Sequence, residues 1–446
     1  MMALNCSRGA LLAAAALFGL HTPAAAQEND TIDYTIRQGD TLIGLASKYF
    51  TNTSVIGQVM VLNQIRDPRR LPIGKVLKLP RDILKSKPEP VRVLHVSGDV
   101  TVNRNGSSVS AKQNDTIGAG AVITTGAREF ITLGGTGASK ISLPSNSSIR
   151  IRGAKRYIIN EAIDFDVQVL RGRSAIEAPK LKRDERYNVS TPRAVTAVRG
   201  TKFRVAFDEA KETSLTEVTE GVVSVASAGS ETSLPEKFGI SAFLQGLGET
   251  EALLSAPKLI DPAKTQTGEK VTFQIQPLDN AKAYRTQIAR DQSFIEIIAE
   301  GVSEDLEITF DDLPDGRLRV RSRAIAESGL EGLPIEDGFR RKRVGAAAGI
   351  EESPFADAFK FVWLSEGEGN SFGAFQLWNV ETPEVLVVDE VGLQSNGLYV
   401  SNLKPGKYAW RQATFQILKE EMVNGELKPS EIIKVWTPAL TFDVDE

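Results

Sequence analysis

The sequence predicts a mainly β, multidomain protein, in which a small βααβ module is followed by an all-β domain and two β-sandwich modules. Three observations predict this architecture. Apolar residues follow helical spacing mainly between residues 42 and 64, short alternating runs closed by glycine fill residues 91–228, and two stretches beyond residue 263 repeat one succession of strands. The length of 446 residues suggests roughly three domains of ordinary size.

Residues 1–26 have the pattern of a cleavable signal peptide. Arg8 gives a short positive region, LLAAAALFGL (11–20) gives an apolar run, and three alanines at 24–26 give a small-residue cleavage site before Gln27. The apolar run is too short to remain as a membrane-spanning helix. We therefore expect an exported chain with no membrane span after cleavage.

Charge and the scarcity of two residue types restrict the function. Lys and Arg number 53 and Asp and Glu 57, mixed along the chain, so we expect no nucleic-acid partner. Cys6 is the single cysteine, and His95, in an alternating strand pattern, is the one histidine of the expected mature chain. Sites built on Ser-His-Asp, Cys-His or histidine-bound zinc are therefore not expected, and no cofactor or metal is predicted. Carboxylate-only hydrolysis stays open, although no spacing indicates a particular pair.

The first module has the order strand, helix, helix, strand. A β-branched strand at 34–36 precedes two amphipathic stretches at 42–50 and 54–64, and KVLKLP (75–80) alternates as a closing strand. The segments QGDTL (38–42), LN (62–63) and DPRRLPIGKVLKLP (67–80) resemble a LysM domain in the right order, so we expect that domain over 32–80. The resemblance implies two helices packed on a two-stranded antiparallel sheet.

The LysM resemblance also implies a partner, peptidoglycan, bound through its N-acetylglucosamine-containing glycan in a shallow groove between two loops. Carried over by position, the groove residues are Gly39, Asp40, Thr41 and Leu42 on one side and Leu71, Pro72, Ile73 and Gly74 on the other. Asp40 is also expected to cap the first helix. Ile43 stands where many members of the family carry an aromatic residue. Whether a single repeat binds usefully is open, because tandem copies gain by avidity.

A polar, proline-bounded stretch at 81–90 reads as a linker, and residues 91–228 read as strands broken by turns. Within them VLRGRSAIEA (169–178), VSTPRAVTAVRGTKFRV (189–205) and TEVTEGVVSV (216–225) together resemble a FecR domain. The resemblance implies an all-β periplasmic module. The chain has a cleavable signal in place of the cytoplasmic sigma-binding segment and internal transmembrane helix of the signalling protein that names the family, so direct regulation of a sigma factor is not carried over.

The glycine steps of this region are expected to be structural. Gly172, Gly200 and Gly221 would be turns or bulges where successive strands change direction. The Arg199-Gly200-Thr201 step would be a corner and not a catalytic site, with the apolar residues around it in the core. Those residues are Val195, Val198, Phe203 and Val205.

The C-terminal half is expected to begin with a connector at 229–262, with some helical character near Ala252–Leu254. Two sandwiches follow, at 263–338 and 350–446, on either side of the basic run FRRKRVGAAAG (339–349), which reads as an interdomain loop. Both sandwiches resemble fibronectin type III-like domains, the first through AYRTQIARDQSF and SGLEGLP. The four tryptophans of this half are expected in or near the cores.

Together these patterns resemble FecR domain-containing periplasmic proteins with an N-terminal LysM domain. We predict a non-enzymatic, peptidoglycan-associated protein of the periplasm that presents a FecR-like scaffold or sensing surface to a protein partner. Two alternatives stay open: a peptidoglycan hydrolase that uses a carboxylate, and an envelope signal receptor that acts on another membrane protein.

Overall fold

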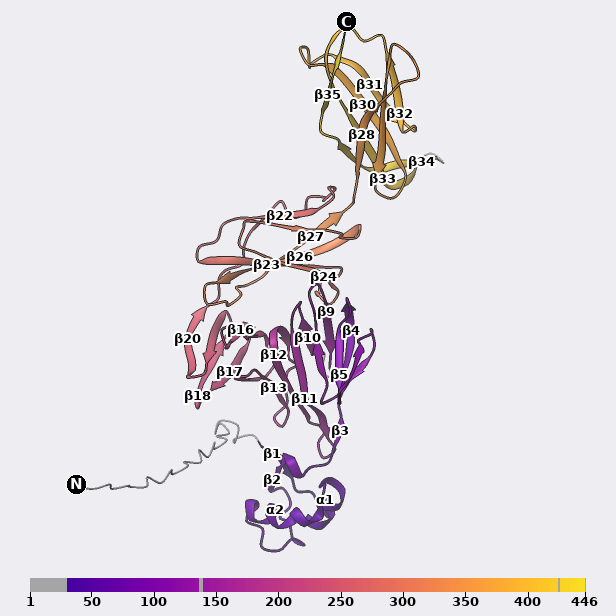
Figure 1. Cartoon of the computed structure of the whole chain (residues 1–446). Helices are drawn as coiled ribbons and strands as arrows, with labels where there is room; N and C mark the ends of the chain where they lie inside the picture. Colours follow the sequence, from indigo (N-terminus) through magenta and orange to yellow (C-terminus); the bar gives the residue numbers. More distant parts are fainter. Residues whose placement is uncertain (1–29, 136–138, 424–425, 446) are drawn as a thin grey trace, which may run out of the picture.

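The computed structural model describes residues 30–135, 139–423 and 426–445. The mainly β prediction is confirmed, because strands greatly outnumber the two α-helices in this part of the chain. Figure 1 shows four parts in sequence order, with the helical module at one end and the C-terminal sandwich at the other. The signal-peptide prediction for 1–26 lies outside the described residues. None of the described helices is long and apolar enough to cross a membrane.

The N-terminal module has the predicted βααβ order. Strands β1 (Thr31–Thr35) and β2 (Val76–Pro80) pair antiparallel, and helices α1 (Leu42–Tyr49) and α2 (Ile56–Asn63) lie between them in the chain. The Asn63 amide fixes α2 to β2, because it accepts from the Lys78 N–H at 2.7 Å and donates to the Lys78 carbonyl at 2.7 Å.

Residues 81–90 do not form a linker, contrary to the sequence prediction. The short helix η3 (Arg81–Ile83) leads to β3 (Ser86–Pro88), which pairs with β11 (Ser148–Tyr157). Ile83 and Leu84 are buried in the core of the N-terminal module. Tyr157 of β11 lies in the same core, so the module and the next domain share hydrophobic side chains. The stretch was predicted to be a linker because most of its residues are polar, although it contains these two buried apolar residues.

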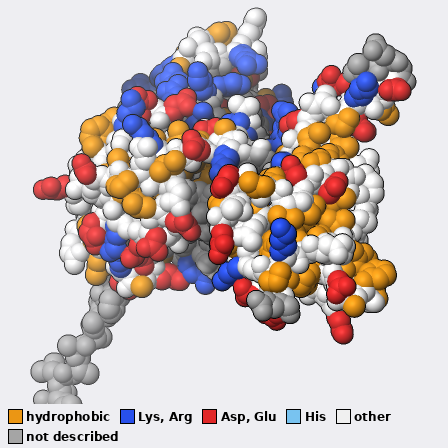
Figure 2. Space-filling model, turned by 90° about the horizontal axis from the view of Figure 1, so that it is seen from above, with side chains coloured by type: hydrophobic (Ala, Val, Ile, Leu, Met, Phe, Trp, Pro, Cys, Tyr) orange, Lys and Arg blue, Asp and Glu red, His pale blue; other side chains and the backbone are white. Residues whose placement is uncertain are grey.

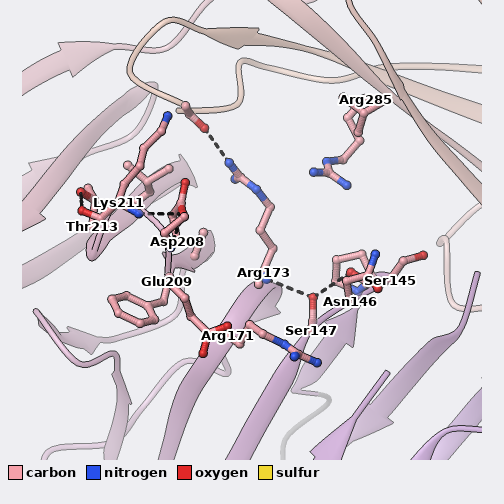
Figure 3. Close-up of a pocket in the computed structure, with 18 of the residues that line it drawn as sticks. Ser145, Asn146, Ser147, Arg171, Arg173, Asp208, Glu209, Lys211, Thr213 and Arg285 are labelled. Atoms are coloured by element: carbon pink, nitrogen blue, oxygen red, sulfur yellow. Dashed lines mark hydrogen bonds between the residues drawn. The ribbon is translucent and has the colours of Figure 1, made fainter. Parts of the chain in front are cut away.

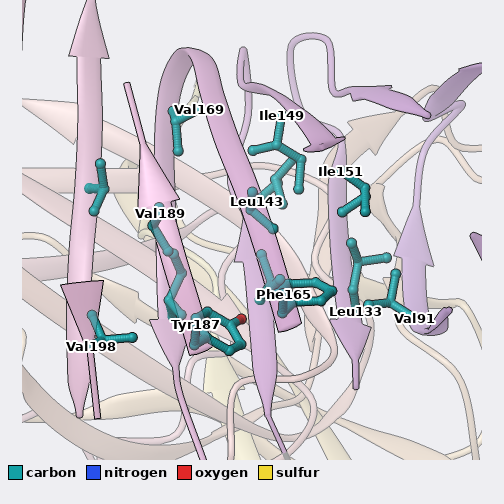
Figure 4. Close-up of a cluster of buried hydrophobic side chains, with 14 of the residues drawn as sticks. Val91, Leu133, Leu143, Ile149, Ile151, Phe165, Val169, Tyr187, Val189 and Val198 are labelled. Atoms are coloured by element: carbon teal, nitrogen blue, oxygen red, sulfur yellow. The ribbon is translucent and has the colours of Figure 1, made fainter. Parts of the chain in front are cut away.

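The all-β domain consists of two sheets with a common core. One sheet has the order β6-β5-β8-β11-β12-β13-β14-β17-β18 and the other β7-β4-β9-β10-β12-β15-β16-β19-β20. Their bounds are β4 (Val91–Ser97), β5 (Thr101–Arg104), β6 (Ser107–Ser110), β7 (Thr116–Ile117), β8 (Val122–Thr124), β9 (Phe130–Gly134), β10 (Lys140–Leu143), β12 (Ile163–Glu177), β13 (Arg186–Ser190), β14 (Val195–Val198), β15 (Lys202–Asp208), β16 (Thr213–Glu220), β17 (Val222–Ser227), β18 (Ser230–Pro235), β19 (Phe238–Phe243) and β20 (Gly246–Ala252). Some of the buried hydrophobic side chains that fill this core, among them the aromatic Phe165 and Tyr187, are drawn in Figure 4.

Three glycines mark the points where the chain passes from one sheet to the other. Gly172 (φ +70°) divides β12 into a part that pairs with β11 and a part that pairs with β15. Gly200 (φ +70°) lies between β14 and β15, and Gly221 (φ +88°) between β16 and β17, which again belong to different sheets. A positive φ is accessible to glycine without strain. The predicted corner at 199–201 is therefore a crossing between sheets.

The apolar residues around that corner divide between core and surface. Val198, Phe203 and Val205 are buried, as expected. Val195 is 40% exposed, so its predicted place in the core is wrong. Side chains alternate between the two faces of a strand, and β14 buries only Thr196 and Val198.

Replacing Gly172 by alanine should destabilise this domain by about 2 kcal/mol or more, because the positive φ would be strained and the new Cβ would lie 2.5 Å from the Asn146 carbonyl oxygen. Gly106→Ala is the matched control, since φ is +83° there and no atom lies within 4 Å of the added Cβ. Urea denaturation measures both. Equal losses would show that the close approach to Asn146 contributes nothing.

The predicted connector at 229–262 is also wrong over most of its length. Strands β18 and β19 extend the two sheets, and β20 pairs with β19. Leu234, Ile240 and Ala242 belong to the same core as Val91. No helix forms at 252–254, where β20 ends. The segment alternates with the period of a strand, and its partners lie on earlier strands that composition alone does not indicate.

Two β-sandwiches complete the chain. The first packs sheet β21-β22-β25 on β24-β23-β26-β27, and the second packs β28-β29-β32 on β31-β30-β33-β34, with β35 paired to β33. Their bounds are β21 (Leu259–Ile260), β22 (Val271–Ile275), β23 (Ala281–Ala289), β24 (Ile297–Ser303), β25 (Glu307–Phe310), β26 (Gly316–Ala326), β27 (Ile335–Arg341), β28 (Gly345–Glu351), β29 (Ala358–Glu366), β30 (Ser371–Asn379), β31 (Leu386–Leu393), β32 (Gly397–Ser401), β33 (Gly406–Val423), β34 (Glu426–Trp436) and β35 (Leu440–Val444). Trp363 and Trp410 are buried in the second core, and Trp378 and Trp436 are half-buried.

The basic run at 339–349 is not a loop over most of its length. Phe339 and Arg341 are buried at the end of β27, and β28 begins at Gly345. Residues 342–344 alone join the sandwiches. The backbone of this link is held by Asp315, whose carboxylate accepts from the Arg343 N–H at 2.8 Å and from the Lys342 ammonium at 2.9 Å.

Candidate glycan-binding groove and the charged domain junction

The two loops predicted to form a groove lie side by side at one end of the N-terminal module. The Leu42 N–H donates to the Pro68 carbonyl at 2.9 Å, and the Gly74 N–H donates to the Ile36 carbonyl at 2.9 Å. Because β1 and β2 are antiparallel, the pair Thr35–Val76 marks the end from which both loops extend. The opposite end of this sheet leads to the all-β domain. The two loops therefore lie at the end of this sheet that is distant from the all-β domain.

The eight predicted groove residues differ in what they can offer a ligand. Gly39, Pro72, Ile73 and Gly74 are exposed, and the Ile73 side chain is 68% exposed. Leu42 and Leu71 are buried, so their side chains serve the core and only their backbone can face a ligand. The remaining two, Asp40 and Thr41, are half-buried.

Asp40 does not cap the first helix, contrary to the sequence prediction. Thr41 is the capping residue, and its hydroxyl accepts from the Gly44 N–H at 3.1 Å. Asp40 instead accepts from the Tyr34 hydroxyl at 2.9 Å and from the Arg37 N–H at 2.7 Å. Burial and this hydrogen bond raise the pKa of Tyr34 to about 12, so the phenol is neutral at physiological pH. Asp40 thus fixes the shape of the first groove loop.

Family models identify the N-terminal module and the two-sheet domain. Residues 34–80 match the model of the LysM domain, and residues 121–224 match the model of the FecR protein. The chain contains a LysM domain and a FecR domain. The LysM match spans both helices and both groove loops, and the FecR match lies within the two-sheet domain and includes all three glycine crossings.

Comparison with individual proteins gives partial matches. The N-acetylmuramoyl-L-alanine amidase XlyB of Bacillus subtilis (strain 168) is 30% identical over 90 residues, which cover 19% of this chain and 27% of that enzyme. A putative anti-sigma factor from Parabacteroides distasonis is 15% identical, with a TM-score of 0.25, over 29% of this chain and 59% of that one. A two-domain fibronectin type III segment of chicken tenascin is 12% identical, with a TM-score of 0.20, over 42% of this chain and 98% of that one. The chain therefore spans about a quarter of the curated relative.

A buried network of charges joins the FecR domain to the first sandwich, and the sequence analysis did not anticipate it. Its centre is Glu331, 1% exposed, whose carboxylate lies 2.6 Å from Arg285 and 3.3 Å from both Arg173 and Arg323. Glu217 of the FecR domain accepts from the Glu331 N–H at 2.7 Å. Burial alone would raise the pKa of Glu331, but the surrounding arginine charges hold it well below its ordinary value.

An open cleft of about 940 Å³ runs along one side of this junction. Figure 3 shows Arg173 and Arg285 approaching it from the FecR domain and the sandwich respectively, with Arg171, Glu209 and Lys211 around its wall. Arg173 and Arg285 each form an ion pair with a carboxylate. Arg173 lies 3.0 Å from Glu217, and Arg285 lies 2.9 Å from Glu300. The cleft thus has a fixed floor with mixed charges at its rim.

The one histidine of the described residues is isolated, and no cluster of metal-ligating side chains occurs among them. His95 lies in β4, where burial lowers the pKa of its imidazole, and its Nε2 has no hydrogen-bond partner among them. Within the same ranges no group of three or more His, Cys, Asp or Glu side chains could hold a metal ion. The domains identified, LysM and FecR, are binding or sensing modules.

Proposed function

We propose that the protein is exported to the cell envelope, binds the N-acetylglucosamine-containing glycan of peptidoglycan through its LysM groove, and presents its FecR domain and sandwiches to a partner protein. The observation that carries this proposal is the direction of the groove. The two loops assigned to it extend from the end of the LysM sheet that is opposite the end joined to the FecR domain. A long glycan strand can therefore reach it without meeting the other domains.

The groove offers the chemistry that an acetamido sugar requires. Gly39 and Gly74 expose their backbone with no side chain in the way, so peptide groups can donate to and accept from the sugar amide. Ile73 provides an exposed apolar surface for the acetyl methyl group. Asp40 and the Leu42–Pro68 hydrogen bond hold the two loops in place before the ligand arrives, and such preorganisation favours binding.

The second part of the proposal rests on the surface of the second sandwich. Several large hydrophobic side chains are exposed there, and Figure 2 shows hydrophobic side chains gathered over one side of the molecule. Four of them lie on strands of the β31-β30-β33-β34 sheet: Val387, Val391, Met422 and Leu427. Exposed apolar patches are typical of protein interaction sites. This surface supports a role in presenting a scaffold to a partner.

Ile73→Glu should weaken co-sedimentation of the protein with purified sacculi by about tenfold or more, because it places a charge on the apolar part of the groove. Val61→Glu is the matched control. Val61 is 81% exposed on α2 of the same module, so this variant changes the charge equally outside the groove. Equal weakening by both variants, or no sedimentation of the unaltered protein, would contradict glycan binding in this groove. Release of soluble muropeptides from the sacculi would contradict a non-enzymatic role.

A further inference from the structure

The junction between the FecR domain and the first sandwich carries one more positive than negative charge. Its members are connected to one another by ion pairs and by shared hydrogen bonds to Gln287. They comprise five guanidiniums, Arg173, Arg204, Arg285, Arg321 and Arg323, and four carboxylates, Glu217, Glu300, Glu331 and Glu336. Burying an uncompensated charge costs several kcal/mol, so the surplus needs a counterion.

Arg323 is the residue on which the surplus falls. It is 5% exposed, and its acidic contact is Glu331 at 3.3 Å, a carboxylate that it shares with Arg173 and Arg285. Its Nε has no hydrogen-bond partner among the described residues. Burial, and then the charges of Arg321 and Arg204, hold the pKa of Arg323 well below its ordinary value.

Arg321 and Arg204 are better satisfied than Arg323. The Arg321 guanidinium donates to the Gln287 side-chain oxygen at 2.8 Å and lies 4.0 Å from the centre of the Phe294 ring. Arg204 donates to Glu217 at 2.5 Å and to the Glu331 carbonyl at 2.5 Å. The positive charge that lacks a counterion is therefore located at Arg323.

A small cavity lies where this charge is unmet. It has a volume of about 20 Å³. Glu331 is the one carboxylate in its walls, which otherwise include five arginines and two serines: Arg173, Arg204, Arg285, Arg321, Arg323, Ser142 and Ser174. This volume holds about one water-sized group. A second cleft, of about 620 Å³ and open to solvent, shares Ser142, Arg204, Arg321 and Arg323 with the cavity. An ion can therefore enter from the surface.

We propose that this cavity binds one monatomic, monovalent anion, chloride under ordinary conditions, on the guanidinium of Arg323. Its single charge matches the surplus of the network, and the volume is too small for phosphate or sulfate. The anion is held only while the FecR domain and the first sandwich are joined, because Arg204 and Ser142 come from one and Arg321 and Arg323 from the other. By linkage, chloride stabilises the joined form.

The test is thermal unfolding of the full chain at constant ionic strength, with sodium gluconate replaced stepwise by sodium chloride, bromide or formate. Chloride and bromide should raise Tm in a saturable manner by about 2–4 °C. Arg323→Leu should abolish this dependence. Arg317→Leu, on the same strand but exposed, alters the net charge equally and should retain it. A rise with formate but with neither halide would overturn the assignment of a halide.

Crystals of the unaltered chain soaked in bromide give a reading that is independent of the folding of any variant. An anomalous peak beside Arg323 is expected. Ordered water without bromide in the cavity would overturn the proposal. An equal chloride response in the unaltered chain and in Arg323→Leu would also overturn it. Neither outcome bears on glycan binding, which is measured with the LysM variants.

Discussion

Glu331→Gln should lower the free energy of unfolding of the unit formed by the FecR domain and the first sandwich by about 3–5 kcal/mol. The carboxylate is 1% exposed and is contacted by arginines from both domains, Arg173 and Arg204 from one and Arg285 and Arg323 from the other. The amide keeps the size of the side chain but leaves these buried guanidiniums without their common counterion. Such a loss costs more than the pairs contributed, because the unpaired charges stay buried.

The measurement is urea denaturation followed by hydrogen exchange of the amides in β16 and β26, which carry Glu217 and Arg323, together with limited proteolysis to detect separation of the two domains. Glu327→Gln is the control. Glu327 lies four positions before Glu331 in the sequence, but it is exposed and pairs with the surface residue Lys282. Removing that surface pair should change stability little, because water and salt screen exposed ion pairs. If the two variants lose the same stability, the carboxylate of Glu331 does not hold the junction together.

Tyr157→Ala should cost about 3–5 kcal/mol and should loosen the LysM domain from the FecR domain. Tyr157 belongs to β11 of the FecR domain, yet it is fully buried within the LysM core. Its hydroxyl donates to Asp164 at 2.8 Å, and the guanidinium of Arg81 lies 5.6 Å from the centre of its ring. Truncation would leave a cavity the size of an aromatic ring between the two domains.

Hydrogen exchange of the amides in β1, β2 and η3 reports on this prediction, because these elements adjoin the lost ring. Tyr157→Phe separates packing from hydrogen bonding. It keeps the ring and removes only the hydroxyl, and Asp164 remains paired with Arg186 at 2.9 Å, so a loss of about 1 kcal/mol is expected. Equal exchange rates in the two variants would show that the ring does not couple the domains.

Local patterns predicted the elements of the fold well. The helices of the LysM domain follow from apolar spacing, and the crossings at Gly172, Gly200 and Gly221 follow from glycines that interrupt β-branched runs, because both signals depend on neighbouring residues. The errors lie where a segment's partners are distant in sequence. Residues 81–90 and 229–252 are polar on average, and only their pairing with earlier or later strands makes them part of a domain.

The candidate sites divide in the same way. The groove residues are a prediction from family resemblance. The structure brings their loops together but buries the side chains of Leu42 and Leu71. The charged junction was missed because Glu217 and Glu331 are 114 positions apart. One signal for it was present. RLRVRSR (317–323) places four arginines on one face of a strand, a pattern that is costly unless acidic residues or an anion cover it.

The shared core at Tyr157 has a mechanical consequence. The LysM domain has no flexible tether to the rest of the chain, since η3 and β3 are packed against the FecR domain, and the link at 342–344 is held by Asp315. Packing at each of these joints restrains rotation of one domain against the next. If the groove binds glycan as proposed, the orientation of the bound LysM domain is passed on to the FecR domain through Tyr157 and β3.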